Sequence, residues 1–127
     1  MSIYLNDVGL TELPVSPKHI HGNFEVVRNK LTSLQGSPEV IEGYFNCSLN
    51  HLNDLMGAPK FVRGSFNCNV NDLITLKGGP KKIGRFFECR FFWCRENKLT
   101  ILIYSPKTCR IMSGNNKLLT LDYIPSI

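Results

Sequence analysis

A strict 21-residue repeat is the feature of this sequence that most constrains its fold. Each unit opens with a leucine, repeats it three positions later, and continues with a proline, an aliphatic residue, a phenylalanine and an asparagine. Internal repeats of about 20 to 29 residues with this pattern of leucines and asparagines are typical of solenoids, in which each unit buries its apolar side against its neighbours. The opening leucines are Leu10, Leu31, Leu52 and Leu73, and the phenylalanines are Phe24, Phe45, Phe66 and Phe87.

Residues around each phenylalanine alternate between apolar and polar, as in the segment Gly43-Tyr-Phe-Asn-Cys-Ser. On a strand, this period of two sends Phe45 and Cys47 inward and Tyr44 and Asn46 outward. Stacked units then place their strands side by side in one parallel sheet. The prolines disfavour a long helix on the opposite side. We expect strands near residues 3–5, 24–26, 45–47, 66–68, 87–89 and 111–113.

An asparagine stands two residues before each leucine that opens a new unit, at positions 29, 50, 71, 97 and 116. An asparagine side chain offers donors and an acceptor to backbone groups that a turn leaves unpaired. We therefore predict a ladder of asparagines that bond the backbone within their own unit and the next one, which is a structural role rather than a ligand-binding one.

The fourth and fifth units depart from the period. Phe87 and Asn97 are ten residues apart, twice the spacing in the first three units, so we place five added residues within the range 89–96. Phe87 and Cys89 are assigned to the strand of this unit. The fifth unit spans 19 residues, and Ile111 takes its phenylalanine position.

The repeat resembles the leucine-rich repeat family. The segment Phe45-x-Cys47-x-x-Asn50-x-Leu52 fits the L-x-L-x-x-N-x-L part of that consensus, and the first unit is similar to the short repeats of secreted bacterial effectors and of phage and viral proteins. The resemblance covers nearly the whole chain. It implies an all-β, right-handed, leucine-rich-repeat-like solenoid with one parallel sheet and little helix. We expect a single domain, residues 1–127, of about six 21-residue units with half units at both ends.

Composition and motifs argue against several classes of protein. No stretch approaches the roughly 20 apolar residues of a membrane span, and the first residues lack the basic and apolar regions of a secretory signal. Cys47, Cys68 and Cys89 occupy the place of Val26 in the repeat, which indicates small buried apolar side chains. We expect reduced thiols, a cytoplasmic location (the host cytoplasm if the protein is viral) and no membrane partner.

The sequence carries no signature of catalysis, of a cofactor or of a metal. It has no phosphate-binding loop, nucleophile elbow or paired carboxylates. His19, His21 and His51 lie at variable repeat positions and are interpreted as surface residues. Cys89 and Cys94 are five apart, and no second close pair accompanies them as zinc sites usually require. We therefore predict a protein that is not an enzyme, with no cofactor and no metal.

Charge and aromatic residues concentrate between Lys77 and Arg95. This stretch holds six basic residues and one acidic residue, which accounts for the whole net charge of +5. Arginine and aromatic residues are enriched at binding hot spots, and insertions in repeat proteins map to loops, often on the binding face. The predicted partner-binding residues, in this stretch and on the outward strand positions, are Phe86, Glu88, Arg90, Phe92, Trp93, Arg95, Tyr44, Asn46, Asn67 and Asn69.

Alternation along the fourth strand turns Phe86, Glu88, Arg90 and Phe92 towards the open face of the sheet. Trp93 has two interpretations, either an anchor for a partner or a core residue that fills space created by the insertion.

Three functions from different classes follow. The resemblance implies a small protein–protein interaction module that blocks or bridges a partner protein, as an inhibitor or other modulator of a host factor made by a phage or a bacterium. The alternative is a nucleic-acid-binding protein, because basic residues interleaved with aromatic ones in residues 77–95 suit phosphate contact and base stacking. A third hypothesis is a homodimer or larger self-assembly through the uncapped ends.

Overall fold

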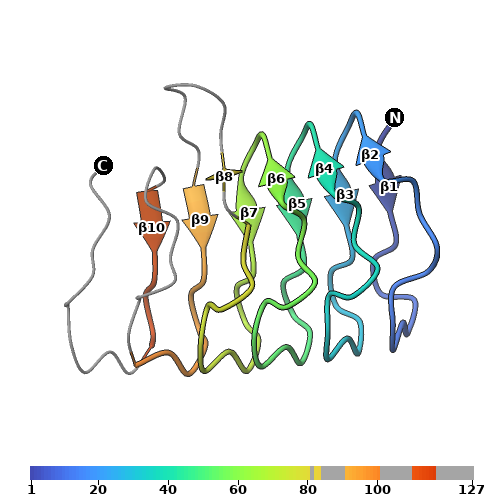
Figure 1. Cartoon of the computed structure of the whole chain (residues 1–127). Helices are drawn as coiled ribbons and strands as arrows, with labels where there is room; N and C mark the ends of the chain where they lie inside the picture. Colours follow the sequence, from blue (N-terminus) through green and yellow to red (C-terminus); the bar gives the residue numbers. More distant parts are fainter. Residues whose placement is uncertain (81, 84–90, 101–109, 117–127) are drawn as a thin grey trace.

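The chain folds into short parallel strands that stack unit upon unit (Figure 1). The structure, a computed structural model, describes residues 1–80, 82–83, 91–100 and 110–116. Within these ranges there is no helix, and every pair of strands runs parallel. The expected all-β class with little helix is confirmed for this part of the chain.

The larger sheet has six strands in the order β1-β3-β5-β7-β9-β10. Its register repeats the sequence period, since Ile3 pairs with Phe24, Phe24 with Phe45, and Phe45 with Phe66. The strand before the first full unit therefore extends the sheet, as expected of a half unit. The strands are β1 (Ile3–Tyr4), β3 (Phe24–Glu25), β5 (Phe45–Asn46), β7 (Phe66–Asn67), β9 (Phe91–Trp93) and β10 (Arg110–Met112).

A second sheet of four strands contradicts the expectation of a single sheet. Ile20 pairs with Ile41, and Val62 with Ile83, so the aliphatic residue after each proline also forms a ladder. The ladder continues past the strand ends, as in the bond from Arg63 N to Ile41 O at 2.9 Å. The strands are β2 (His19–Ile20), β4 (Val40–Ile41), β6 (Phe61–Val62) and β8 (Lys82–Ile83), in the order β2-β4-β6-β8.

The strand of the fourth unit lies later in the chain than predicted. Phe66 pairs with Phe92, so Phe92 rather than Phe87 continues the phenylalanine ladder, and Cys94 rather than Cys89 takes the buried cysteine position. The five added residues thus precede the strand, after Ile83. Residues 84–90 lie outside the described residues. In the fifth unit Ile111 pairs with Phe92, which confirms its assignment.

The interior is a stack of identical positions from successive units. Phe24, Phe45 and Phe66 are completely buried, and their ring centroids are 5.7 Å and 5.1 Å apart. Burial of each such side chain stabilises the fold by about 1.5–3 kcal/mol, and aromatic contact adds to this. The apolar positions of the repeat are buried, as at Leu34, Leu55, Ile41, Phe45, Phe66, Cys47 and Cys68.

Asparagine side chains tie each unit to the unit before it. The Asn50 amide oxygen accepts a hydrogen bond from Leu31 N at 3.0 Å, and Nδ2 donates to Val26 O at 2.9 Å and to Cys47 O at 3.0 Å. Asn71 repeats the arrangement one unit on. The predicted ladder is present at all five positions, but each side chain bonds its own unit and the preceding one, not the next one as predicted: Asn29, Asn50, Asn71, Asn97 and Asn116.

Units approach so closely that some positions admit only glycine. Gly57 has a φ of 89°, and a Cβ there would lie 2.5 Å from the backbone nitrogen of Gln35 in the preceding unit. Such a distance is a clash with atoms that the stacking holds in place. The short period therefore depends on the absence of a side chain at this turn.

A left-handed residue precedes each asparagine of the ladder. Arg28, Leu49 and Val70 have φ values of 55°, 58° and 54°, and Glu96 and Asn115 continue the series. Left-handed backbone costs an ordinary residue roughly 1–2 kcal/mol, and a β-branched side chain such as that of Val70 fits it worst. Asparagine tolerates the conformation better, as it does at position 115.

We predict that Val70→Asn raises the free energy of unfolding by about 1 kcal/mol and the melting temperature by about 4 °C, because it relieves this strain at a partly exposed position. Thermal and denaturant unfolding measure both. The control is Val27→Asn, one position before the left-handed Arg28, which should give no gain. An unchanged or lower stability of Val70→Asn would contradict the claim that the left-handed backbone strains Val70.

Candidate functional site

The outward side of the larger sheet is polar and accessible. Tyr4 is 54% exposed and Glu25, Asn46 and Asn67 are partly exposed, whereas the phenylalanines that alternate with them are completely buried. These four share one row of the register. We call this surface the open face, and its described side chains are Tyr4, Asn6, Asn23, Glu25, Tyr44, Asn46, Asn67 and Asn69.

Glu25 organises the first half of the open face. Its carboxylate accepts hydrogen bonds from the Tyr44 hydroxyl and, at 2.7 Å, from Asn6 Nδ2. The hydrogen bond to Glu25 and partial burial raise the pKa of Tyr44, so this phenol stays a donor. Asn23 Nδ2 donates to the Tyr4 hydroxyl at 3.4 Å. Two tyrosines are thus held in place by one carboxylate and one amide.

The predicted contact residues Asn46, Asn67 and Asn69 use their amide oxygens within the chain. Asn46 Oδ1 accepts from the backbone nitrogen of Ser48 at 3.0 Å and from its hydroxyl at 2.7 Å. Asn67 Oδ1 accepts from Asn69 N at 2.9 Å, and Asn69 Oδ1 accepts from Arg95 N at 2.6 Å. These turns fix the strand ends, a structural role that the sequence analysis missed. The signal was present, since asparagine favours bonds to the backbone two residues on.

The predicted contacts of the fourth unit are only partly described. Phe86, Glu88 and Arg90 lie outside the described residues. Phe92 pairs with the buried Phe66, so it stands at a core position of the register and not, as alternation had suggested, at an outward one. Trp93 pairs with Asn67, which places it in the row of Glu25 and Asn46 on the open face.

Arg95 follows the end of β9 and is exposed, and its backbone N–H donates a hydrogen bond to Asn69 Oδ1. The predicted contacts Tyr44, Asn46, Asn67, Asn69 and Arg95 therefore lie together on or beside one surface. The choice between the two interpretations of Trp93 concerns its side chain, which lies outside what the structure describes.

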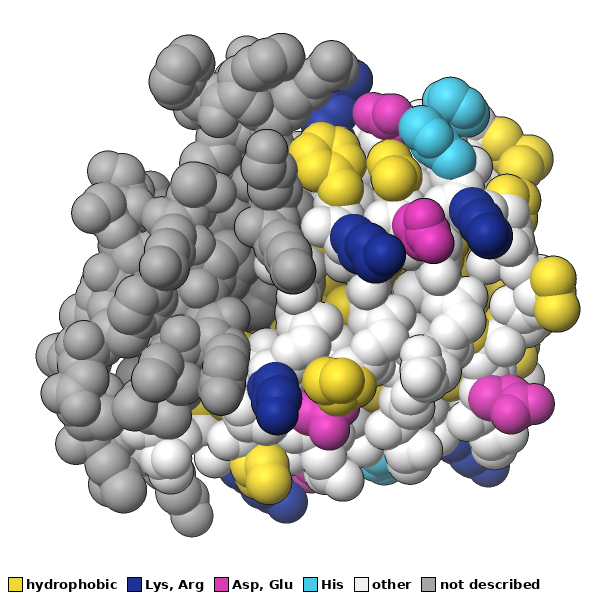
Figure 2. Space-filling view, in the orientation of Figure 1, with side chains coloured by type: hydrophobic (Ala, Val, Ile, Leu, Met, Phe, Trp, Pro, Cys, Tyr) yellow, Lys and Arg dark blue, Asp and Glu magenta, His cyan; other side chains and the backbone are white. Residues whose placement is uncertain are grey.

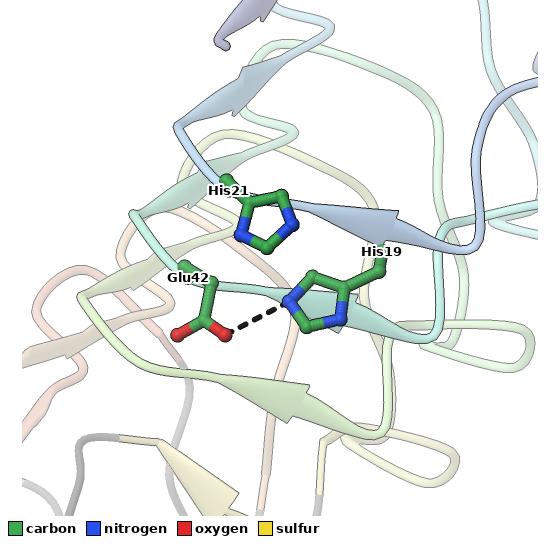
Figure 3. A group of neighbouring side chains, drawn as sticks. All are labelled: His19, His21 and Glu42. Atoms are coloured by element: carbon green, nitrogen blue, oxygen red, sulfur yellow. Dashed lines mark hydrogen bonds and ion pairs between the residues drawn. The ribbon is translucent and has the colours of Figure 1, made fainter.

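A second group of side chains lies over the smaller sheet. The rings of His19 and His21 stack with centroids 4.4 Å apart, and His19 Nε2 lies 2.8 Å from a Glu42 carboxylate oxygen (Figure 3). Histidine side chains gather with charged ones at the edge over β2 and β4 in the space-filling view (Figure 2). Both histidines are exposed, as predicted. Their closeness to Glu42 was missed, because the second sheet that aligns them was not foreseen.

The three described cysteines are free thiols in the core. Cys47, Cys68 and Cys94 are fully buried, and no disulfide joins them. Burial raises the pKa of the Cys94 thiol to about 12 and raises the pKa of Cys47 and Cys68 as well. The thiolate is the reactive form, so these groups are inert at ordinary pH. The prediction of reduced thiols is confirmed for Cys47 and Cys68, and Cys89 lies outside the described residues.

We predict that a Cys89→Ser/Cys109→Ser variant shows no thiol reactive towards Ellman's reagent at pH 8 within minutes. The three remaining thiols are neutral and shielded in the fold. All three should react once denaturant unfolds the chain, and the absorbance of the released thiolate counts them. Rapid stoichiometric reaction of the native variant would show that the cysteine ladder is accessible.

Comparisons with known proteins identify no relative. No family model, no curated protein and no solved structure matches the chain. Among the described residues, no helix is long and apolar enough to cross a membrane.

Proposed function

We propose that the chain is a leucine-rich-repeat-like solenoid whose open face binds a partner protein and thereby blocks or bridges it. Strands of a parallel sheet are usually covered on both faces. Here one side of the larger sheet is buried, and the other presents the partly exposed side chains of Glu25, Asn46 and Asn67. Stacked repeats present extended surfaces of this kind to their partners.

The observation that carries the proposal is the fixed arrangement of Tyr4 and Tyr44 around Glu25 and Asn23. Tyrosine is enriched at interface hot spots because it combines apolar area with a polar tip. Side chains held by their neighbours lose little rotamer freedom on binding, which lowers the entropic cost of association. The surface is therefore prearranged for a protein partner.

The register adds Trp93 to the same row and Arg95 beside it. Both are residue types enriched at hot spots. The proposed contact surface therefore runs across five strands, from Tyr4 on β1 to Trp93 on β9. The cytoplasmic location, the phage or bacterial setting and a host factor as the partner belong to the proposal too, and their support is the likeness of the repeats.

Nucleic-acid binding is the competing function. Its support is the net charge of +5 within residues 77–95. Two of the basic residues in this stretch, Lys77 and Arg95, are exposed. Glu25 in the first half of the open face argues against a phosphate backbone there, because like charges repel. Copurified nucleic acid, and affinity that falls steeply with salt, would favour this function instead.

A photo-crosslinking experiment tests the proposal. Benzoylphenylalanine replaces Tyr4 on the open face or, as the matched control, Phe61 on the smaller sheet. We predict that the probe at Tyr4 joins one defined protein from a bacterial lysate, whereas the probe at Phe61 does not. Glu25→Arg should lower the yield about tenfold or more, because it removes the group that holds Tyr44.

Equal crosslinking from both positions would contradict binding at the open face. Crosslinks to nucleic acid alone would replace the proposed function with its competitor. Circular dichroism of Glu25→Arg confirms that the variant is folded before yields are compared.

A further inference from the structure

The histidine group arises from the pairing of β2 with β4. Ile20 is buried, so His19 and His21, which flank it, both project to the solvent side of the strand (Figure 3). Glu42 stands one 21-residue unit after His21, and Ile20 pairs with Ile41. This register sets the carboxylate beside both imidazole rings.

The three side chains offer donor atoms that already converge. One nitrogen of each histidine and one carboxylate oxygen of Glu42 all lie within 4.8 Å of one another. Zinc binds such atoms at about 2.0–2.2 Å, which sets its ligands roughly 3.4 Å apart in a tetrahedral site. Rotation of these exposed side chains by a modest angle would bring the donor atoms from within 4.8 Å to the separation that a zinc ion needs, without movement of the backbone.

We propose that His19, His21 and Glu42 form a binding site for a divalent transition-metal ion of the class that prefers imidazole, such as Zn²⁺ or Ni²⁺. Two imidazoles and one carboxylate form a known ligand set for such ions. The exposure of the histidines leaves the remaining coordination positions to water or to a donor from another molecule. This inference is independent of the proposed function of the open face.

Two features of the surroundings shape the site. Arg63 Nη1 lies 3.7 Å from the other Glu42 oxygen, so the carboxylate is oriented but its charge is partly balanced. The equivalent pairs of residues in the next two units are Val40 with Glu42 and Phe61 with Arg63, neither of which could hold a metal. Among these units, only the first pairs two histidines with an acid in its neighbour.

The test is titration of the metal-free full chain with Zn²⁺ and, separately, with Ni²⁺, followed by calorimetry. Cys89→Ser and Cys109→Ser in every protein keep accessible thiols from binding the ions. We expect one ion per chain, and affinity at least tenfold lower in His19→Ala, His21→Ala and Glu42→Gln. His51→Ala is the matched control, because His51 is also exposed and also lies near an acid, Asp72.

A second readout identifies the ligands directly. Long-range nitrogen–proton correlation spectra should show the ring nitrogens of His19 and His21 shifting on addition of Zn²⁺, and those of His51 unchanged. Unchanged affinity in the His19→Ala/His21→Ala double variant, or an equal loss in His51→Ala, would overturn the site.

Discussion

The bonds between each buried asparagine and the backbone of the preceding unit are the interaction on which this structure depends. A 21-residue coil has too few residues to pair all its backbone groups within itself, and a turn through a left-handed residue leaves several of them facing inward. The amide of Asn50 bonds Leu31 N and the Val26 carbonyl, which flank the turn of the preceding unit at Arg28. It also bonds the Cys47 carbonyl, just before its own turn. Because the same geometry recurs at Asn71 and Asn97, the strands fall into register, and the phenylalanines meet ring to ring.

Repetition of one unit accounts for the uniform core and leaves the outward positions of the two sheets free to differ. Positions that point inward repeat the same apolar residue, so the core is a set of ladders that needs little variety. Positions that point outward are free to differ, and there the open face gathers tyrosines around Glu25. The smaller sheet does the same at its edge, where units one and two bring His19 and His21 to Glu42. Both candidate functional groups therefore consist of outward residues that differ from unit to unit.

Sequence reasoning recovered the period, five of the six strands of the larger sheet, the core and the asparagine ladder, because each follows from spacing alone. It misplaced the fourth full unit, because Phe87-Glu-Cys89 and Phe92-Trp-Cys94 present the same pattern twice. The turn decides between them: Cys47 lies three residues before Asn50, and Cys94 lies three before Asn97. The second sheet was missed although Ile20, Ile41, Val62 and Ile83 recur at the same period, because no run of alternating apolar and polar residues like that around each phenylalanine marks them as strands. The closeness of the histidines to Glu42 was missed for the same reason.

The most direct test of the asparagine ladder is the stability of Asn50→Ala beside that of Asn53→Ala, an exposed asparagine in the next unit. Denaturant unfolding should show a loss on the order of 1–3 kcal/mol for Asn50→Ala, because Leu31 N and the Val26 carbonyl would be left buried without their partner. The Asn53→Ala variant should unfold like the parent protein. Equal midpoints for Asn50→Ala and the parent would contradict the ladder as the basis of the fold.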